Sequence, residues 1–133
     1  MNNEFFCREI PLIGEEAFLR LHNARIILFG VGGVGGYILE ALVRAGIESI
    51  TVVDNDTVSM SNVNRQILAT VNTIGMKKTD AAIERAKSIN PDVRIKAIEQ
   101  FYLLPLVRQP KKGKDQNIQK QTTSEHFSWR FLP

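Results

Sequence analysis

The chain has 133 residues and a mass of 15.0 kDa, which suits one domain with a real core but is short for an enzyme with separate cofactor and substrate domains. Its hydrophobic fraction of 44% is typical of a soluble globular protein, no apolar run approaches the roughly 20 residues that span a bilayer, and a single cysteine excludes an internal disulfide. The net charge of +3 is uneven, because residues 1–102 carry 11 Lys or Arg against 12 Asp or Glu (net −1) and residues 103–133 carry 6 against 2 (net +4).

The N-terminus has neither the basic start nor the apolar stretch of a signal peptide, so we expect a cytoplasmic protein. Residues 1–23 are predicted to form a helical appendage, with an apolar set from Phe5 to Ile13 and a short helix that begins at Glu15.

Residues 24–102 are predicted to form a partial nucleotide-binding domain. "ARIILFG" (24–30) is a continuous apolar run ending in glycine, which suits a strand buried on both faces. A helix follows, ended by Gly46, with an apolar face at i, i+4, i+7, i+8 and i+11: Val34, Ile38, Ala41, Leu42 and Ala45.

"SITVVD" (49–54) is the second predicted strand, and residues 55–75 are polar and irregular. A second helix is expected from about Lys77 to Ser88, ended by Asn90-Pro91, and "VRIKAIEQF" (93–101) alternates as a third strand would. The order β-α-β-loop-α-β predicts an α/β fold, an incomplete Rossmann-like parallel sheet flanked by helices. The basic segment 103–133 has no such period, and we expect it to be disordered or loosely attached.

A glycine-rich stretch, "GVGGVGG" (30–36, the glycine loop), lies where the first strand meets the first helix. Gly30, Gly32 and Gly35 fit G-x-G-x-x-G, and Gly33 belongs to the same predicted phosphate loop. Such a loop brings backbone N–H groups at a helix N-terminus close to an anion. Tight strand–helix packing without a ligand is the alternative.

Charged and amide side chains follow the second strand. Asp54 ends this strand, where a carboxylate accepts hydrogen bonds from ribose hydroxyls of NAD or ATP alike, and Asp56 is a candidate to hold Mg²⁺ or its waters. Downstream donors that suit phosphate oxygens are Asn62, Arg65, Gln66 and Lys78. Hydride transfer needs no such cations, whereas breaking the α–β phosphate bond does, so we interpret the segment as a polyphosphate clamp.

Together, "FGVGGVGGY", "DNDTVSMSNVNRQI" and "TIGMKK" resemble the ATP-dependent carboxylate-adenylating enzymes of the ubiquitin-activating (E1-like) superfamily. "REIPLIGEEAF" (8–18) and the form "NDTVSMSNVNRQI" are most similar to bacterial tRNA threonylcarbamoyladenosine dehydratases. The resemblance spans about residues 4–102.

The resemblance implies site roles and a reaction. It makes Gly32 part of the phosphate loop, Asp54 the ribose ligand, and Asn62, Arg65 and Lys78 triphosphate ligands that Gln66 supports. Arg8 matches an arginine that reaches into the partner subunit's site, which implies a homodimer; with Arg65 and Lys78 it completes the expected catalytic set. The implied reaction is attack of a carboxylate, carried by a modified tRNA adenosine, on the α-phosphate of ATP, and ring closure then expels AMP.

Past residue 102 the superfamily continues with an apolar strand ending in Asp-x-x-Asp, which residues 103–133 do not match. We therefore expect a chain truncated or frameshifted after about residue 102, with an aggregation-prone uncovered sheet face; a genuine RNA-binding tail is the alternative. Three functions stay open: the tRNA dehydratase, activation of the C-terminal carboxylate of a ubiquitin-like sulfur carrier, and an inactive nucleotide-binding fragment. An NAD-dependent reductase would leave Arg65 and Lys78 without a role.

Overall fold

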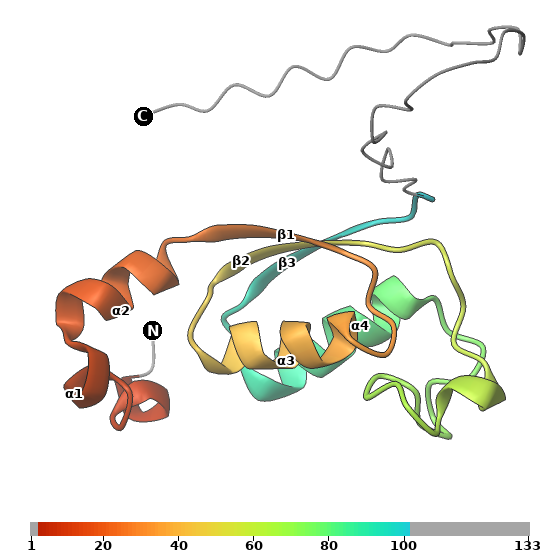
Figure 1. Cartoon of the computed structure of the whole chain (residues 1–133), viewed down its shortest axis with the longest axis horizontal. Coiled ribbons are helices and arrows are strands. Elements are labelled where there is room, and N and C mark those ends of the chain that lie inside the picture. The colour runs from red at the N-terminus through yellow and green to blue at the C-terminus, as the bar shows by residue number, and fades with distance from the viewer. Residues whose placement is uncertain (1–2, 102–133) are drawn as a thin grey trace, which may run out of the picture. The chain divides into compact units, whose positions relative to one another are not determined.

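The computed structural model describes residues 3–101, and the predicted tail from 103 lies outside them. Its centre is a parallel sheet in the order β1 (Arg25–Phe29), β2 (Ser49–Val53) and β3 (Arg94–Ile98) (Figure 1). The three predicted strands and their parallel pairing are confirmed. Each observed strand is shorter than its predicted range, by one to three residues at an end.

Two helices connect the strands, α3 (Gly35–Arg44) and α4 (Lys78–Ile89), and both lie on the same side of the sheet (Figure 1). They pack against each other, and the Arg85 guanidinium donates to the Glu40 carboxylate at 2.7 Å across their contact. Together with β2 they enclose the core, whose fully buried side chains include Leu39, Ile50 and Val52.

The face that α3 buries differs from the expected one. Its buried residues are Gly36, Leu39 and Val43, whereas Val34 and Ile38 are 75% and 42% exposed. Leu42, which belongs to the predicted face, does pack partly buried against the core. The helix is apolar on more than one face, so periodicity identified the helix but only part of its buried side.

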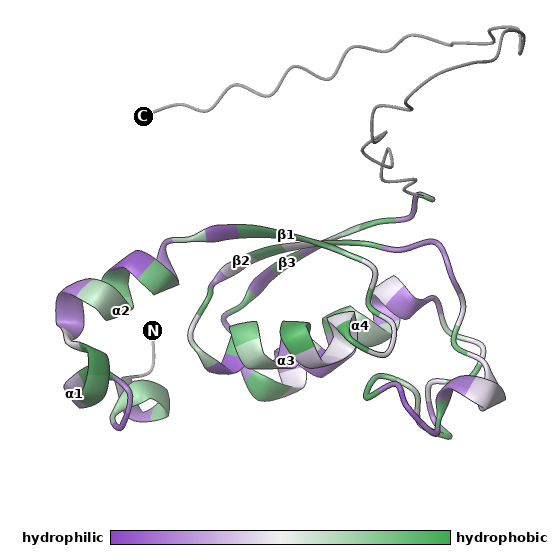
Figure 2. Ribbon diagram, viewed as in Figure 1, coloured by the Kyte–Doolittle hydropathy of each residue, from purple (hydrophilic) through white to green (hydrophobic). Residues whose placement is uncertain are grey.

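The opposite face of the sheet is open within the described residues. Strand β1 alternates between exposed and half-buried positions, and Ile27 at its centre is 52% exposed. Figure 2 shows that most of this strand is hydrophobic. The expected uncovered apolar face is therefore present in the described part of the chain.

The N-terminal segment consists of a 3-10 helix (Asn3–Phe6), α1 (Ile10–Ile13) and α2 (Glu15–His22). The predicted helix from Glu15 is confirmed. Phe18 is buried against Phe6, with ring centroids 5.0 Å apart, and His22 Nδ1 lies 2.9 Å from the Gly46 carbonyl oxygen. This segment therefore packs at the end of the sheet where the strands begin. None of the helices within residues 3–101 is long and apolar enough to cross a membrane.

Candidate functional site

The glycine loop leaves the end of β1 and enters α3 directly. Gly30 has φ +80°, and a Cβ on Gly35 would lie 1.8 Å from the Gly30 carbonyl oxygen, so both positions require glycine. The residue before α3, Val34, makes no side-chain cap, and in the first turn of the helix the Gly36 N–H donates to the Gly32 carbonyl oxygen at 3.1 Å.

Asp54 follows the last residue of β2, beside this loop. Its Oδ2 accepts a hydrogen bond from the backbone N–H of Val31 at 2.8 Å, and its Oδ1 accepts one from the N–H of Asp56 at 2.9 Å. The carboxylate predicted to bind ribose therefore also anchors the glycine loop to the second strand. Each carboxylate oxygen keeps further lone-pair capacity for a hydroxyl donor.

Lys78 is the first residue of α4, as expected, and its Nζ donates to Asp56 Oδ2 at 2.6 Å. The lysine side chain is 8% exposed and the aspartate side chain 61%. The preceding Lys77 is different, because its side chain is 47% exposed and a hydrogen bond with Glu99 raises the pKa of Lys77. Only the second of the two adjacent lysines faces the predicted site.

Residues 59–68 form a segment that packs against the glycine loop. Asn62 is buried and closes a short 3-10 helix (Met60–Asn62), in which its Oδ1 accepts from the Ser59 N–H at 3.1 Å. Any contact of Asn62 with phosphate would therefore come from its Nδ2 donors. A Cβ on Gly36 would lie 3.0 Å from Ile67 Cγ2, so the segment packs closely on the loop.

Gln66 and Arg65 come from the same segment. Gln66 is 8% exposed, and its Nε2 lies 3.9 Å from a Cβ placed on Gly32. Arg65 is exposed, and its Nη1 donates to the Ser61 carbonyl at 2.7 Å and to Asn64 Oδ1 at 3.0 Å. The role of Asn64 in orienting this guanidinium was missed, although its place directly before the arginine was a signal.

The structure brings the predicted residues to one end of the sheet, with Arg8 as the exception. Arg8 follows Phe6 by two residues, so Phe6 shows where Arg8 lies. Phe6 Cε1 would be 3.0 Å from a Cβ placed on Gly46, which lies just before the start of β2. Asp54 follows the other end of β2, and five residues at about 3.3 Å each separate these ends by roughly 16 Å. Arg8 therefore lies too far away to join the site of its own chain.

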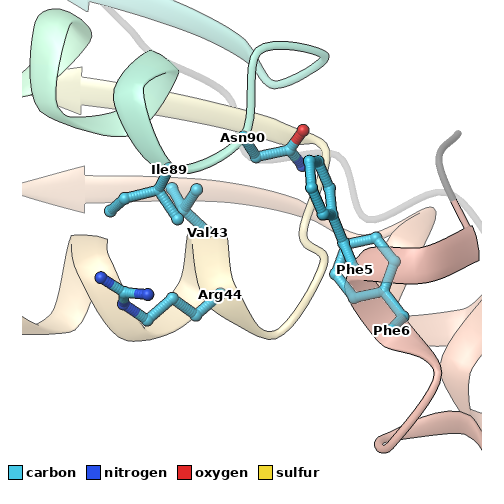
Figure 3. Close-up of a pocket in the computed structure, with 6 residues that line it drawn as sticks. All are labelled: Phe5, Phe6, Val43, Arg44, Ile89 and Asn90. Carbon is cyan, nitrogen blue, oxygen red and sulfur yellow. The ribbon is translucent and has the colours of Figure 1, made fainter.

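A pocket of about 310 Å³ lies where the N-terminal segment meets the ends of α3 and α4 (Figure 3). It contains none of the predicted site residues, and its lining consists of Phe5, Phe6, Val43, Arg44, Ile89 and Asn90. It is remote from the glycine loop, because these helices begin near the loop and end here.

The described residues leave room for the phosphates of ATP but do not form a complete metal site of their own. Around Gly32 and Gly33 a Cβ would meet nothing nearer than 3.7 Å, so phosphates have room to approach the backbone. Residues 3–101 contain no group of three or more side chains suited to a metal. Asp54 and Asp56 are thus compatible with Mg²⁺ that arrives with a polyphosphate, which needs only one or two carboxylates.

The sequence matches the ThiF family over residues 6–115. It is 41% identical to the tRNA threonylcarbamoyladenosine dehydratase of Bacillus subtilis over 97 residues, which cover 73% of this chain and 38% of the relative. The sulfur carrier protein adenylyltransferase of Thermus thermophilus is 39% identical over 88 residues, which cover 66% of this chain and 32% of that relative. The family match passes the predicted boundary at 102, but the structure there is not described, so the domain limits 1–23, 24–102 and 103–133 stay predictions.

The fold is also similar to solved structures. The crystal structure of E. coli tRNA N6-threonylcarbamoyladenosine dehydratase in complex with ATP aligns with a TM-score of 0.72 and 38% identity, covering 74% of this chain and 41% of that one. The same enzyme has been solved with AMP. The chain spans about two fifths of these relatives or less. Because the family match covers most of its sequence, the chain belongs to the ThiF family.

Proposed function

We propose that this chain carries the ATP-binding half of a tRNA threonylcarbamoyladenosine dehydratase, which adenylates the side-chain carboxylate of the modified adenosine and then cyclises it with loss of AMP. The observation that carries the proposal is the convergence at one end of the sheet of a glycine loop, a carboxylate hydrogen-bonded to it, and a buried lysine. The dehydratases of Bacillus subtilis and E. coli, each 41% identical, supply the substrate class.

The chain's residues would bind and orient the nucleotide. Asp54 would accept from the ribose hydroxyls, and the N–H groups of the glycine loop would face the phosphates. Lys78 and Arg65, with the amides of Asn62 and Gln66, would neutralise charge that builds on pyrophosphate as the carboxylate attacks the α-phosphate. Mg²⁺ that arrives with the phosphates would add further positive charge there.

The proposal includes a homodimer. Arg8 lies at the far end of the sheet from its own nucleotide site, so it can take part in the reaction only in the site of a second copy. Its place supports the role that the sequence resemblance implies.

A second candidate function is activation of a ubiquitin-like sulfur carrier, because the Thermus thermophilus adenylyltransferase is almost as similar. ATP–pyrophosphate exchange separates the candidates. We expect exchange that tRNA carrying threonylcarbamoyladenosine stimulates and a sulfur carrier protein does not. The reverse pattern would favour the second function, and ATP binding without exchange under either condition would make the chain a nucleotide-binding fragment.

A further inference from the structure

Asp56 and Lys78 form an asymmetric ion pair, in which the ammonium is buried and the carboxylate is open to solvent. The side chains are 8% and 61% exposed, and Nζ lies 2.6 Å from Oδ2. A buried ammonium is costly unless it is paired, so the position of the Lys78 charge depends on the aspartate.

Backbone contacts also join the two segments that carry Asp56 and Lys78. The Lys78 N–H donates to the Asp56 carbonyl at 2.9 Å, and Thr57 and Lys77 form an antiparallel bridge between the two segments. Little conformational freedom remains to be lost when the side chains meet, which favours a lasting contact over a transient surface pair.

Asp56 is tied in turn to the glycine loop. Its N–H donates to Asp54 Oδ1, while Asp54 Oδ2 accepts from Val31 at the start of the loop. One continuous set of hydrogen bonds therefore runs from the glycine loop through Asp54 and Asp56 to the Lys78 ammonium.

We propose that Asp56 is a positioning residue that holds the Lys78 ammonium beside the glycine loop, ready for the β- and γ-phosphates, rather than a metal ligand. An ammonium has three donors, so Lys78 can keep Asp56 and still bind phosphate. This inference rests on the proposed function, because it assumes that Lys78 meets a polyphosphate.

Two other roles for Asp56 predict different results. A carboxylate that merely occupies Lys78 in the empty site competes with phosphate, so its removal would tighten ATP binding. A metal ligand would matter only when Mg²⁺ is present. A positioning residue weakens ATP binding on removal, with or without the metal.

The test is isothermal titration of ATP and AMP into the full chain and into Asp56→Asn, each with Mg²⁺ and with EDTA. We expect the affinity of Asp56→Asn for ATP to fall about tenfold under both conditions and its affinity for AMP to change little. Asp80→Asn is the matched control, because this exposed carboxylate lies in the first turn of the same helix, and we expect it to bind both nucleotides as the unaltered chain does.

A double-mutant cycle tests whether Asp56 acts through Lys78. In a Lys78→Gln background, Asp56→Asn should cause no further loss of ATP affinity. Unchanged or tighter ATP binding by Asp56→Asn, a loss seen only with Mg²⁺, or an equal loss in the Lys78→Gln background would overturn the inference. Failure of the unaltered chain to bind ATP would instead overturn the proposed function.

Discussion

Gly35→Ala tests how closely the glycine loop and α3 are packed. The added Cβ would lie 1.8 Å from the Gly30 carbonyl oxygen, and real Cβ contacts essentially never fall below 3.0 Å, so these backbone atoms must separate by at least 1.2 Å. No side-chain rotation can relieve the contact because the oxygen belongs to the main chain.

The expected cost follows from this geometry. Overpacking of this kind destabilises by about 1–3 kcal/mol, and the gain in helix propensity offsets less than about 1 kcal/mol at a helix end. We expect a net loss of about 1–2 kcal/mol, which lowers the Tm of a domain this size by roughly 4–16 °C. Circular dichroism against temperature and against urea measures both quantities.

Gly32→Ala is the matched control for stability. Its nearest contact would be Gln66 Nε2 at 3.9 Å, an ordinary van der Waals distance, so the free energy of unfolding should change by less than about 0.5 kcal/mol. The methyl group would nevertheless stand where phosphate approaches, and ATP affinity should fall about tenfold or more. An unchanged Tm for Gly35→Ala would refute the packing argument, and normal ATP binding by Gly32→Ala would refute the phosphate loop.

Three further predictions concern the scaffold. Thr79→Val should raise the free energy of unfolding by about 1 kcal/mol, because Thr79 Oγ1 is buried and has no hydrogen-bond partner among residues 3–101; a destabilised variant in urea titration would contradict this. Burial favours a higher pKa for Glu40, but hydrogen bonds from Arg44 and Arg85 outweigh burial and hold the pKa below 4.5. This carboxylate therefore stabilises the fold above pH 4.5, and the stabilisation is lost as the pH falls through the lowered pKa. Glu40→Gln should therefore lower the Tm at pH 7 and match the unaltered chain in strong acid; a gap that persists there would exclude this cause. Ile27→Thr should reduce self-association in sedimentation velocity, since Ile27 is exposed on the open sheet face, and identical sedimentation would show that this face is not responsible.

Much of the fold follows from local pattern. The apolar runs before Gly30 and Asp54 are too short for helices and end at glycine or aspartate, and both form strands. Asn90-Pro91 ends α4 at Ile89, one residue later than expected. The buried face of α3 was not predictable, because Val34 and Leu39 are both apolar and only the position of the sheet selects between them.

The site was predictable in its residue types but not in its contacts. Glycine spacing and the position of Asp54 predicted a nucleotide loop, yet hydrogen bonds between residues 23 apart, such as Val31 to Asp54, depend on how the strands meet. Asp56 shows the limit most clearly. The sequence suggested metal for this carboxylate, which lies two residues after the predicted ribose ligand, but it did not indicate that the fold brings Lys78 to it from 22 residues away.

The proposed ATP-binding role depends above all on the buried cation at the start of α4, which we expect to bind the phosphates of ATP. Lys78→Gln and Lys77→Gln test it most directly, because the two lysines are adjacent but only Lys78 is buried at the site. Titration of ATP should show at least about a tenfold loss of affinity for Lys78→Gln and almost none for Lys77→Gln. Equal affinities of both variants and the unaltered chain would show that the Lys78 charge takes no part in ATP binding.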